Sequence, residues 1–163
     1  MKRETIEKIL NFLEEKEGKE IPLNWNLIER LETHPDGTQF IYYNHLDLSN
    51  SNITKLPDDL YVDGYLSLTN CKQLIKLPTK LTVWGFLSLT NCKQLTELPD
   101  NLYVSGRLFL IDCKQLTKLP DKLHVGRDLH ITNTPLANKY TNQQIRDIVA
   151  STGGKIEGQI IRE

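Results

Sequence analysis

The chain alternates apolar and polar residues in a pattern that recurs about every 21 residues between Leu46 and Leu136. Each unit opens with two apolar residues separated by one other residue, which is the period of a β-strand with one buried face. The pattern therefore predicts five short strands. Because a unit of this length cannot bury a core alone, the units must stack and present an extended surface. The apolar pairs are Leu46/Leu48, Leu66/Leu68, Leu87/Leu89, Leu108/Leu110 and Leu129/Ile131.

The second half of each unit has the pattern Leu-Pro-x-x-Leu-x-Val, seen first at residues 56–62. Proline fixes φ and cannot donate a backbone hydrogen bond, and too few residues remain before the next strand for a full helix. We therefore expect an extended or 3₁₀-like return segment. Glycine follows it in three copies, where we expect a close approach of the chain into the next strand, whereas the fourth copy has Arg127 in this position. The three glycines are Gly64, Gly85 and Gly106.

A small residue follows the second apolar position in every unit, and all three cysteines of the chain stand in this column. Side chains on neighbouring stacked strands point in parallel instead of converging, and no histidine or fourth cysteine shares the column, so a metal site is not expected. We predict free thiols that pack as small core residues and donate weakly to backbone carbonyls. We expect no cofactor. The column is Ser51, Cys71, Cys92, Cys113 and Thr134.

Two forms of the repeated phrase resemble a known motif. Leu-x-Leu-x-x-Cys-x-x-Leu, at residues 87–95, and Leu-x-Leu-x-x-Ser-x-Ile, at 46–53, look like the cysteine and asparagine forms of the leucine-rich repeat. The short Leu-Pro-x-x-Leu return is similar to the compact repeats of bacterial effectors and of phage proteins. The resemblance covers about residues 43–137. It implies an α/β repeat fold, a curved solenoid with a parallel sheet on its concave side, and protein recognition as the usual activity.

The residues before the repeats predict helices that cap the stack, because a stacked array would otherwise expose its core at both ends. Apolar residues at helical spacing indicate a first helix over 6–13. A second short helix is expected over 25–31, ending before the His-Pro-Asp-Gly turn signal at 34–37. We assign residues 1–42 to this N-terminal helical cap.

The residues after the repeats predict a further helix. Thr141 and Gln144 form a capping-box pattern at its start, and Gly153-Gly154 is a stop signal. The tail after these glycines either forms a final strand or packs over the last unit. We expect a single domain over 1–163, with repeats at 43–137 and a C-terminal cap at 138–163.

Composition and charge are those of a small globular protein. Of the 163 residues, 39% are hydrophobic and 25% are charged, and the formal net charge is −1. The sequence contains no uninterrupted apolar stretch that is long enough for a signal peptide or a membrane span. We therefore expect a cytoplasmic protein that does not act at a membrane, and the resemblance implies a bacterial or phage-infected cell.

The residues that flank the leucine pairs point away from the core and form continuous rows along the stacked strands. Aromatic residues concentrate in these rows, which vary from copy to copy, and aromatic and arginine side chains are typical anchors of interfaces. We expect Trp84 to share a face with Phe86, and Tyr43 to extend the patch at the first strand. The alternative is that aromatic residues simply suit a pleated surface. The candidate protein-binding residues are Tyr43, His45, Asp47, Tyr65, Trp84, Phe86, Arg107, Phe109, Asp128 and His130.

Lysines form two further columns, which we call the lysine ridge. A solvated edge is the simpler interpretation, with Asp58, Asp100 and Asp121 compensating part of the charge. The sharper alternative is a structural or nucleic-acid-associated protein that uses the ridge to bind nucleic acid or an acidic surface. The small number of arginines and the near-neutral net charge argue against nucleic acid. The ridge comprises Lys55, Lys72, Lys76, Lys93, Lys114 and Lys118.

His45, Asp47 and Ser67 have the composition of a nucleophilic triad, and we expect them to share one sheet face. A flat sheet supplies neither oxyanion donors nor a pocket that excludes water. We therefore predict that the protein is not an enzyme and that it binds a protein partner whose identity the sequence does not reveal. The open edges of the sheets leave association between copies as an alternative.

Overall fold

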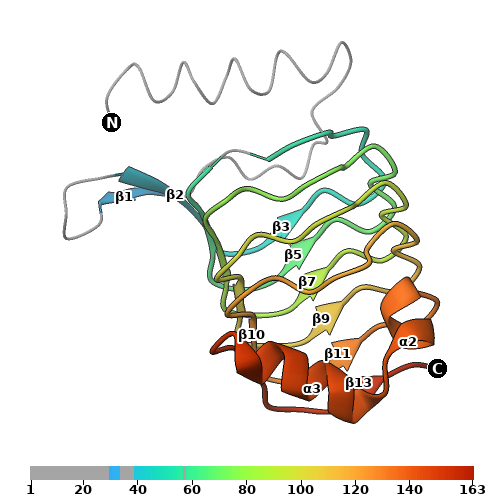
Figure 1. Cartoon of the computed structure of the whole chain (residues 1–163). Coiled ribbons are helices and arrows are strands. Elements are labelled where there is room, and N and C mark those ends of the chain that lie inside the picture. The colour runs from blue at the N-terminus through green and yellow to red at the C-terminus, as the bar shows by residue number, and fades with distance from the viewer. Residues whose placement is uncertain (1–29, 34–38, 57) are drawn as a thin grey trace.

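The computed structural model describes residues 30–33, 39–56 and 58–163, with side chains from residue 44 onward. The chain winds into a parallel β-solenoid in which each turn contributes one strand to each of two sheets (Figure 1). We call them the leucine-pair sheet and the return sheet. The leucine-pair sheet contains β3 (Leu46–Asp47), β5 (Leu66–Ser67), β7 (Leu87–Ser88), β9 (Leu108–Phe109), β11 (Leu129–His130) and β13 (Ile160–Ile161). The return sheet contains β1 (Arg30–Thr33), β2 (Gln39–Tyr43), β4 (Leu60–Val62), β6 (Leu81–Val83), β8 (Tyr103–Val104), β10 (His124–Val125) and β12 (Lys155–Ile156).

The five strands predicted from the leucine pairs are confirmed. They run parallel and pair in register, so that Leu66 lies beside Leu87 and Leu87 beside Leu108. All three side chains are fully buried. The structure therefore shows a parallel solenoid with a period of about 21 residues and leucine-rich strands.

The return segments are extended, as predicted, but they also pair into a sheet that was not predicted. In each segment the Leu-x-Val pattern buries its outer two residues, as at Leu60 and Val62, and leaves the middle residue partly exposed. This is the same two-residue period that marks the leucine pairs. A single period in each copy was too short to distinguish a paired strand from an isolated extended segment.

The glycine column confirms the predicted close approach of the chain. Gly85 N donates to Gly64 O at 2.7 Å, and Gly106 N donates to Gly85 O at 2.9 Å. A Cβ atom at Gly85 would lie only 2.4 Å from Gly64 O, which no side chain tolerates. Arg127 continues this ladder in the fourth copy, since its N donates to Gly106 O at 3.1 Å.

The cysteines behave as the sequence predicted. Cys71, Cys92 and Cys113 are free and fully buried. Each thiol donates to a backbone carbonyl, for example from Cys92 to Leu68 O at 3.1 Å. Burial raises the pKa of Cys92 and of Cys113 to about 12. These thiols are therefore part of the core and stay protonated at neutral pH.

Asparagine and aspartate make the sharp turns before the cysteine column, a feature that the sequence analysis missed. Asn70 and Asn91 both have φ of 62°, in the left-handed region where short polar side chains are tolerated. Asn91 Nδ2 also donates to Asn70 Oδ1 at 2.5 Å, so one turn bonds to the next. The signal was present in the sequence, because an asparagine or aspartate stands at this place in every unit.

The prediction for the residues before the repeats is partly wrong. Leu31, placed at the end of a second helix, lies in the strand β1, which pairs antiparallel with β2. The strand β2 in turn pairs parallel with β4 and adds a first rung to the return sheet, so residues 39–42 belong to the solenoid and not to a helical cap. Free backbone groups at the edge of β4 favour this pairing. The first predicted helix and the turn signal at 34–37 lie outside the described residues.

The helix predicted after the repeats is present as α3 (Asn142–Ser151). Its capping box is formed, since Gln144 N donates to the Thr141 hydroxyl and Thr141 N donates to Gln144 Oε1. Ile145 and Val149 are buried, and α3 lies at the C-terminal end of the stack (Figure 1). A short helix that was not predicted, α2 (Pro135–Lys139), precedes it. The tail forms β12 and β13, which extend both sheets by one more strand.

Candidate functional site

Ring contacts run along the outer face of the leucine-pair sheet from the first strand to the fifth. His45 stacks on Tyr65 with ring centroids 4.7 Å apart, and Tyr65 stacks on Phe86 at 5.0 Å. Phe86 meets Phe109 edge to face at 6.1 Å, and Phe109 stacks on His130 at 4.5 Å. We call these five residues the aromatic line. The structure thus brings half of the candidate binding residues into one connected set.

The aromatic line changes column in the middle of the sheet. Phe109 lies beside Ser88, so it belongs to the column next to that of Phe86. Arg107 occupies the column of Phe86 instead, and its Nε donates to Asp128 Oδ2 at 3.1 Å. The sheet therefore presents stacked rings at its start, and rings beside an ion pair toward its end.

Asp128 holds this ion pair in place. Its Oδ1 accepts a hydrogen bond from Gln159 N at 2.9 Å, while its Oδ2 accepts the bond from Arg107. These bonds hold the pKa of the Asp128 carboxyl below its ordinary value, the backbone bond from Gln159 having the larger effect. The carboxylate stays charged and fixes the direction of the Arg107 side chain.

His130 ends the aromatic line in a partly desolvated position. Burial lowers its pKa, Arg107 lowers it further, and Asp128 acts in the opposite direction. Within the described residues, the buried Nε2 atom of His130 has no hydrogen-bond partner. At neutral pH the uncharged imidazole is therefore the favoured form of His130 in the folded protein.

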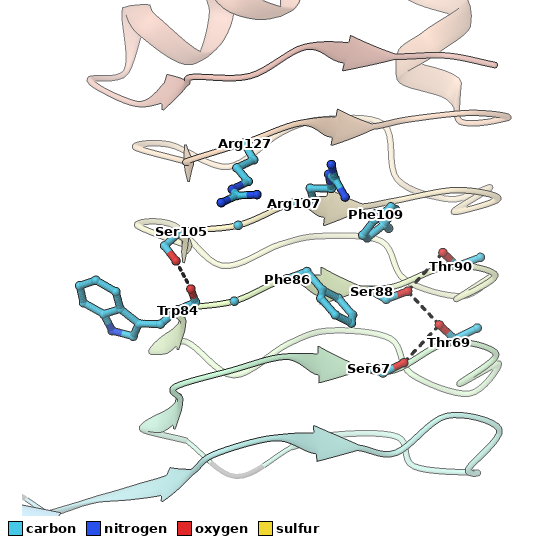
Figure 2. A pocket seen from close by; sticks show the side chains of 12 residues that line it. Ser67, Thr69, Trp84, Phe86, Ser88, Thr90, Ser105, Arg107, Phe109 and Arg127 are labelled. Atoms are coloured by element: carbon cyan, nitrogen blue, oxygen red, sulfur yellow. Dashed lines mark hydrogen bonds between the residues drawn. The ribbon is translucent and has the colours of Figure 1, made fainter.

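Serine and threonine hydroxyl groups bond to one another beside the aromatic line. Ser49 and Ser67 are 2.7 Å apart, Ser67 donates to Thr69 at 3.4 Å, Thr69 and Ser88 are 2.8 Å apart, and Ser88 donates to Thr90 at 3.3 Å. Figure 2 shows this ladder crossing from strand to strand. Because the hydroxyl groups satisfy each other, we interpret them as framework and not as binding groups.

A hollow of about 600 Å³ lies between the aromatic line and the glycine corner. Its walls carry two arginines and no carboxylate. Figure 2 shows Phe86 and Phe109 on one side of it and the two arginines above. The lining residues are Ser67, Thr69, Trp84, Gly85, Phe86, Ser88, Thr90, Ser105, Gly106, Arg107, Phe109 and Arg127.

Two candidate residues lie elsewhere than expected. The ring of Trp84 points away from Phe86 (Figure 2) and contacts the ring of Tyr103 on the return sheet at 5.4 Å. Trp84 precedes the glycine corner, where the chain turns between the sheets, so alternation along one strand did not predict its direction. Tyr43 lies in β2 beside Val62, which places its backbone in the return sheet and not at the first strand of the leucine-pair sheet.

The residues considered for a catalytic triad are bonded to other groups. His45 Nδ1 accepts from Tyr65 N at 3.3 Å, and Asp47 Oδ1 accepts from Ser49 N at 2.9 Å. Ser67 belongs to the hydroxyl ladder. In the described part of the chain, no hydrogen bond joins these three side chains to one another.

The lysine ridge is exposed throughout. Lys114 lies 3.0 Å from Asp112 and also donates to Asn133 O at 3.1 Å. Two of the three aspartates expected to compensate the ridge hold the backbone, since Asp58 and Asp100 accept backbone hydrogen bonds from the next turn. Among the ion pairs of the described residues, the one with Asp112 is the only one that involves the ridge.

The described residues show two further absences. No group of three or more histidine, cysteine, aspartate or glutamate side chains is placed to hold a metal ion. No helix in the described ranges is both long and apolar enough to cross a membrane.

Comparison with known proteins returned no matching family model, no similar curated protein and no similar solved structure. The resemblance to leucine-rich repeats therefore rests on the motif and on the parallel solenoid that the structure shows.

Proposed function

We propose that this protein is a non-enzymatic binding module of the leucine-rich-repeat kind, which recognises a partner protein through the outer face of its leucine-pair sheet. The observation that carries the proposal is the aromatic line, which places large rings side by side across five turns of the solenoid. The resemblance would make this face the concave one, and it favours the cytoplasm of a bacterium or of a phage-infected cell.

Physical reasons favour a protein partner for this face. Phe86 leaves 39% of its surface exposed, although removing an aromatic ring from water is favourable. Arg107 lies beside it on the same face, and aromatic and arginine side chains dominate the energetic centres of protein interfaces. Stacking also restricts the rings before binding, so less conformational entropy is lost when a partner covers them.

A binding role agrees better than catalysis with the hydrogen bonds of the face. His45 and Asp47 accept hydrogen bonds from backbone N–H groups, and Ser67 bonds to a neighbouring hydroxyl. A general base must reach the proton that it abstracts, and a nucleophile needs such a base within hydrogen-bond distance. These side chains support the backbone of the sheet instead.

The lysine ridge supports a second candidate function. Lys72, Lys93 and Lys114 project from corresponding places on successive turns, about 4.8 Å apart in a stacked sheet. An acidic surface or a nucleic acid would relieve their mutual repulsion. A second copy of the chain is a further candidate partner, and sedimentation at several concentrations would detect it.

The test is capture of partners from the native cell by the immobilised whole chain and by two variants. The face variant Phe86→Ala/Phe109→Ala removes the middle of the aromatic line. The ridge variant carries glutamate in place of Lys72, Lys93 and Lys114. We expect the face variant to lose the captured protein and the ridge variant to retain it, with identification by mass spectrometry.

An unrelated immobilised protein of similar size is the control for nonspecific capture, and denaturation curves show that both variants are folded. Loss of capture by the ridge variant alone would reject the proposal in favour of the ridge. Salt provides an independent check, because binding through the ridge should weaken strongly between low and moderate ionic strength.

A further inference from the structure

We propose that the hollow beside Phe86 and Phe109 receives an acidic peptide segment of the partner, with a carboxylate held between Arg107 and Arg127. This inference rests on the proposed protein-binding function and specifies the chemistry that the face recognises. It predicts a partner segment in which aspartate or glutamate stands next to an apolar residue.

The hollow exists because the corner of the solenoid lacks side chains. Gly85 and Gly106 approach the backbone of the preceding turn so closely that no Cβ fits there. Their positions contribute backbone alone to the floor of the hollow. Arg127 occupies the same column one turn later, and Figure 2 shows its side chain reaching back toward the turn that carries Ser105. The one departure of this column from glycine in the repeats therefore places a cation at the rim of the hollow.

Both arginines retain hydrogen-bonding capacity. Arg107 uses only Nε for Asp128, so its two terminal nitrogens make no hydrogen bond within the described residues. Arg127 has no hydrogen bond from its side chain within the same part of the chain. Asp128 acts as a positioning residue, because its second oxygen is fixed by Gln159 N. The planar guanidinium group matches a carboxylate with two parallel hydrogen bonds, which makes arginine the cation suited to this ligand.

Charge complementarity selects an anionic ligand. Of the twelve lining residues, two are cationic and none is acidic. The carboxylate of Asp128 is engaged by Arg107 and by Gln159 N and neutralises only one of the two charges. A ligand carboxylate would supply the missing negative charge, and complementary charges across an interface favour association and select against the wrong ligand.

The neighbouring groups favour a peptide over a nucleic acid. Phe86 and Phe109 form an apolar wall directly beside the arginines, which suits an apolar side chain next to an acidic one. The hydroxyl ladder is satisfied internally and offers few donors for a phosphate backbone. Nucleic acid binding needs many phosphate contacts, whereas the hollow provides two cations.

The experiment is selection from a displayed library of random twelve-residue peptides on the immobilised whole chain. We expect the enriched peptides to share an aspartate or glutamate beside an apolar residue. The strongest peptide is then synthesised with its acidic residue intact and with that residue changed to its amide, and both are titrated by fluorescence anisotropy.

Binding to Arg107→Gln/Arg127→Gln provides the decisive comparison. The acidic peptide should bind this variant at least roughly tenfold more weakly than it binds the wild-type chain, as for the loss of charge-assisted bonds, while the amide peptide should bind both equally weakly. The matched variant Lys122→Gln/Lys139→Gln removes the same net charge from exposed residues outside the hollow and should bind the acidic peptide like the wild type.

Four outcomes would overturn the inference: no enrichment of peptides, enrichment without acidic residues, equal binding of acidic and amide peptides, or undiminished binding of the acidic peptide to Arg107→Gln/Arg127→Gln. Each is distinct from failure of the proposed function. If capture of the cellular partner still requires Phe86 and Phe109, the face binds protein but by other chemistry. If capture does not require them, the proposed function itself fails.

Discussion

The buried columns and the outer face of the leucine-pair sheet lie one residue apart along the same strands, yet they differ in burial and in how much the residues change from turn to turn. The interior repeats leucine and cysteine from turn to turn, and these side chains are almost completely buried. The outer face changes from Tyr65 and Phe86 to Arg107 and Asp128 within a single column. Stacking requires the interior to repeat, because each turn packs only against copies of itself.

The difference shows where the chain was free to vary. An interior position must match the positions above and below it, so a change there propagates along the stack. An exterior position has to satisfy only its neighbours on the face, as the ion pair and the ring contacts do. The proposed recognition therefore uses the outer face, while the interior provides the stability of the stack.

The largest contrast is expected from truncating one residue of each kind. Leu89 is fully buried at the centre of the stack, so Leu89→Ala should lower the free energy of unfolding by about 2–5 kcal/mol through lost burial and a cavity. Phe86→Ala, on the exposed side of the same strand region, should cost only about 0.5–1.5 kcal/mol, mainly from its ring contacts. Urea denaturation measures both values. Equal losses would show that the aromatic line is structural.

A smaller effect is expected at the corner where the two sheets meet. Gly85→Ala would place Cβ about 2.4 Å from Gly64 O, a backbone atom that accepts the bond from Gly85 N. The backbone must shift, and overpacking of this kind typically costs about 1–3 kcal/mol. The control is Thr132→Ala on the outer face, which should change stability by less than about 0.5 kcal/mol. A neutral result at Gly85 would mean that the corner is more open than the hydrogen bonds indicate.

The features predictable from sequence are those that repeat. Five copies of the leucine pair and three cysteines in one column identify the buried face, because five coincident patterns outweigh the weak propensity of any single strand. The helix α3 was predictable from its own capping box, which needs no tertiary information.

The features that failed depend on neighbours that local sequence does not specify. The apolar spacing that ends at Leu31 predicts a helix, whereas Leu31 lies in strand β1, whose formation depends on pairing with β2. Trp84 was assigned to the wrong face because the chain turns at Gly85 immediately after it. The hollow was invisible in sequence, since it arises from the absence of side chains in the glycine column together with Arg127. Aligning the repeats showed the substitution but not its position in space.

The smallest effect concerns the end of the aromatic line, where the face borders the interior. Burial lowers the pKa of His130 below its ordinary value of 6.5, so the unfolded chain takes up a proton before the folded chain does. The free energy of unfolding should therefore be highest at neutral pH, where His130 is uncharged in both states. It should fall as the pH drops through about 6.5 and level off below the folded-state pKa of His130. Urea denaturation at pH 7.5 and at pH 5.0, together with an NMR titration of the His130 ring protons, measures this effect.

Two variants separate His130 from other groups that titrate in acid. His130→Gln should remove this step, so the loss of stability between the two pH values becomes smaller. Arg107→Gln removes a cation that lowers the His130 pKa and leaves Asp128, which raises it, so the ring titration should move to higher pH. A ring titration that stays in place would mean that Arg107 does not act on His130. The ion pair and the aromatic line would then be two independent features of the face, because the charge of Arg107 would not change the pKa of His130.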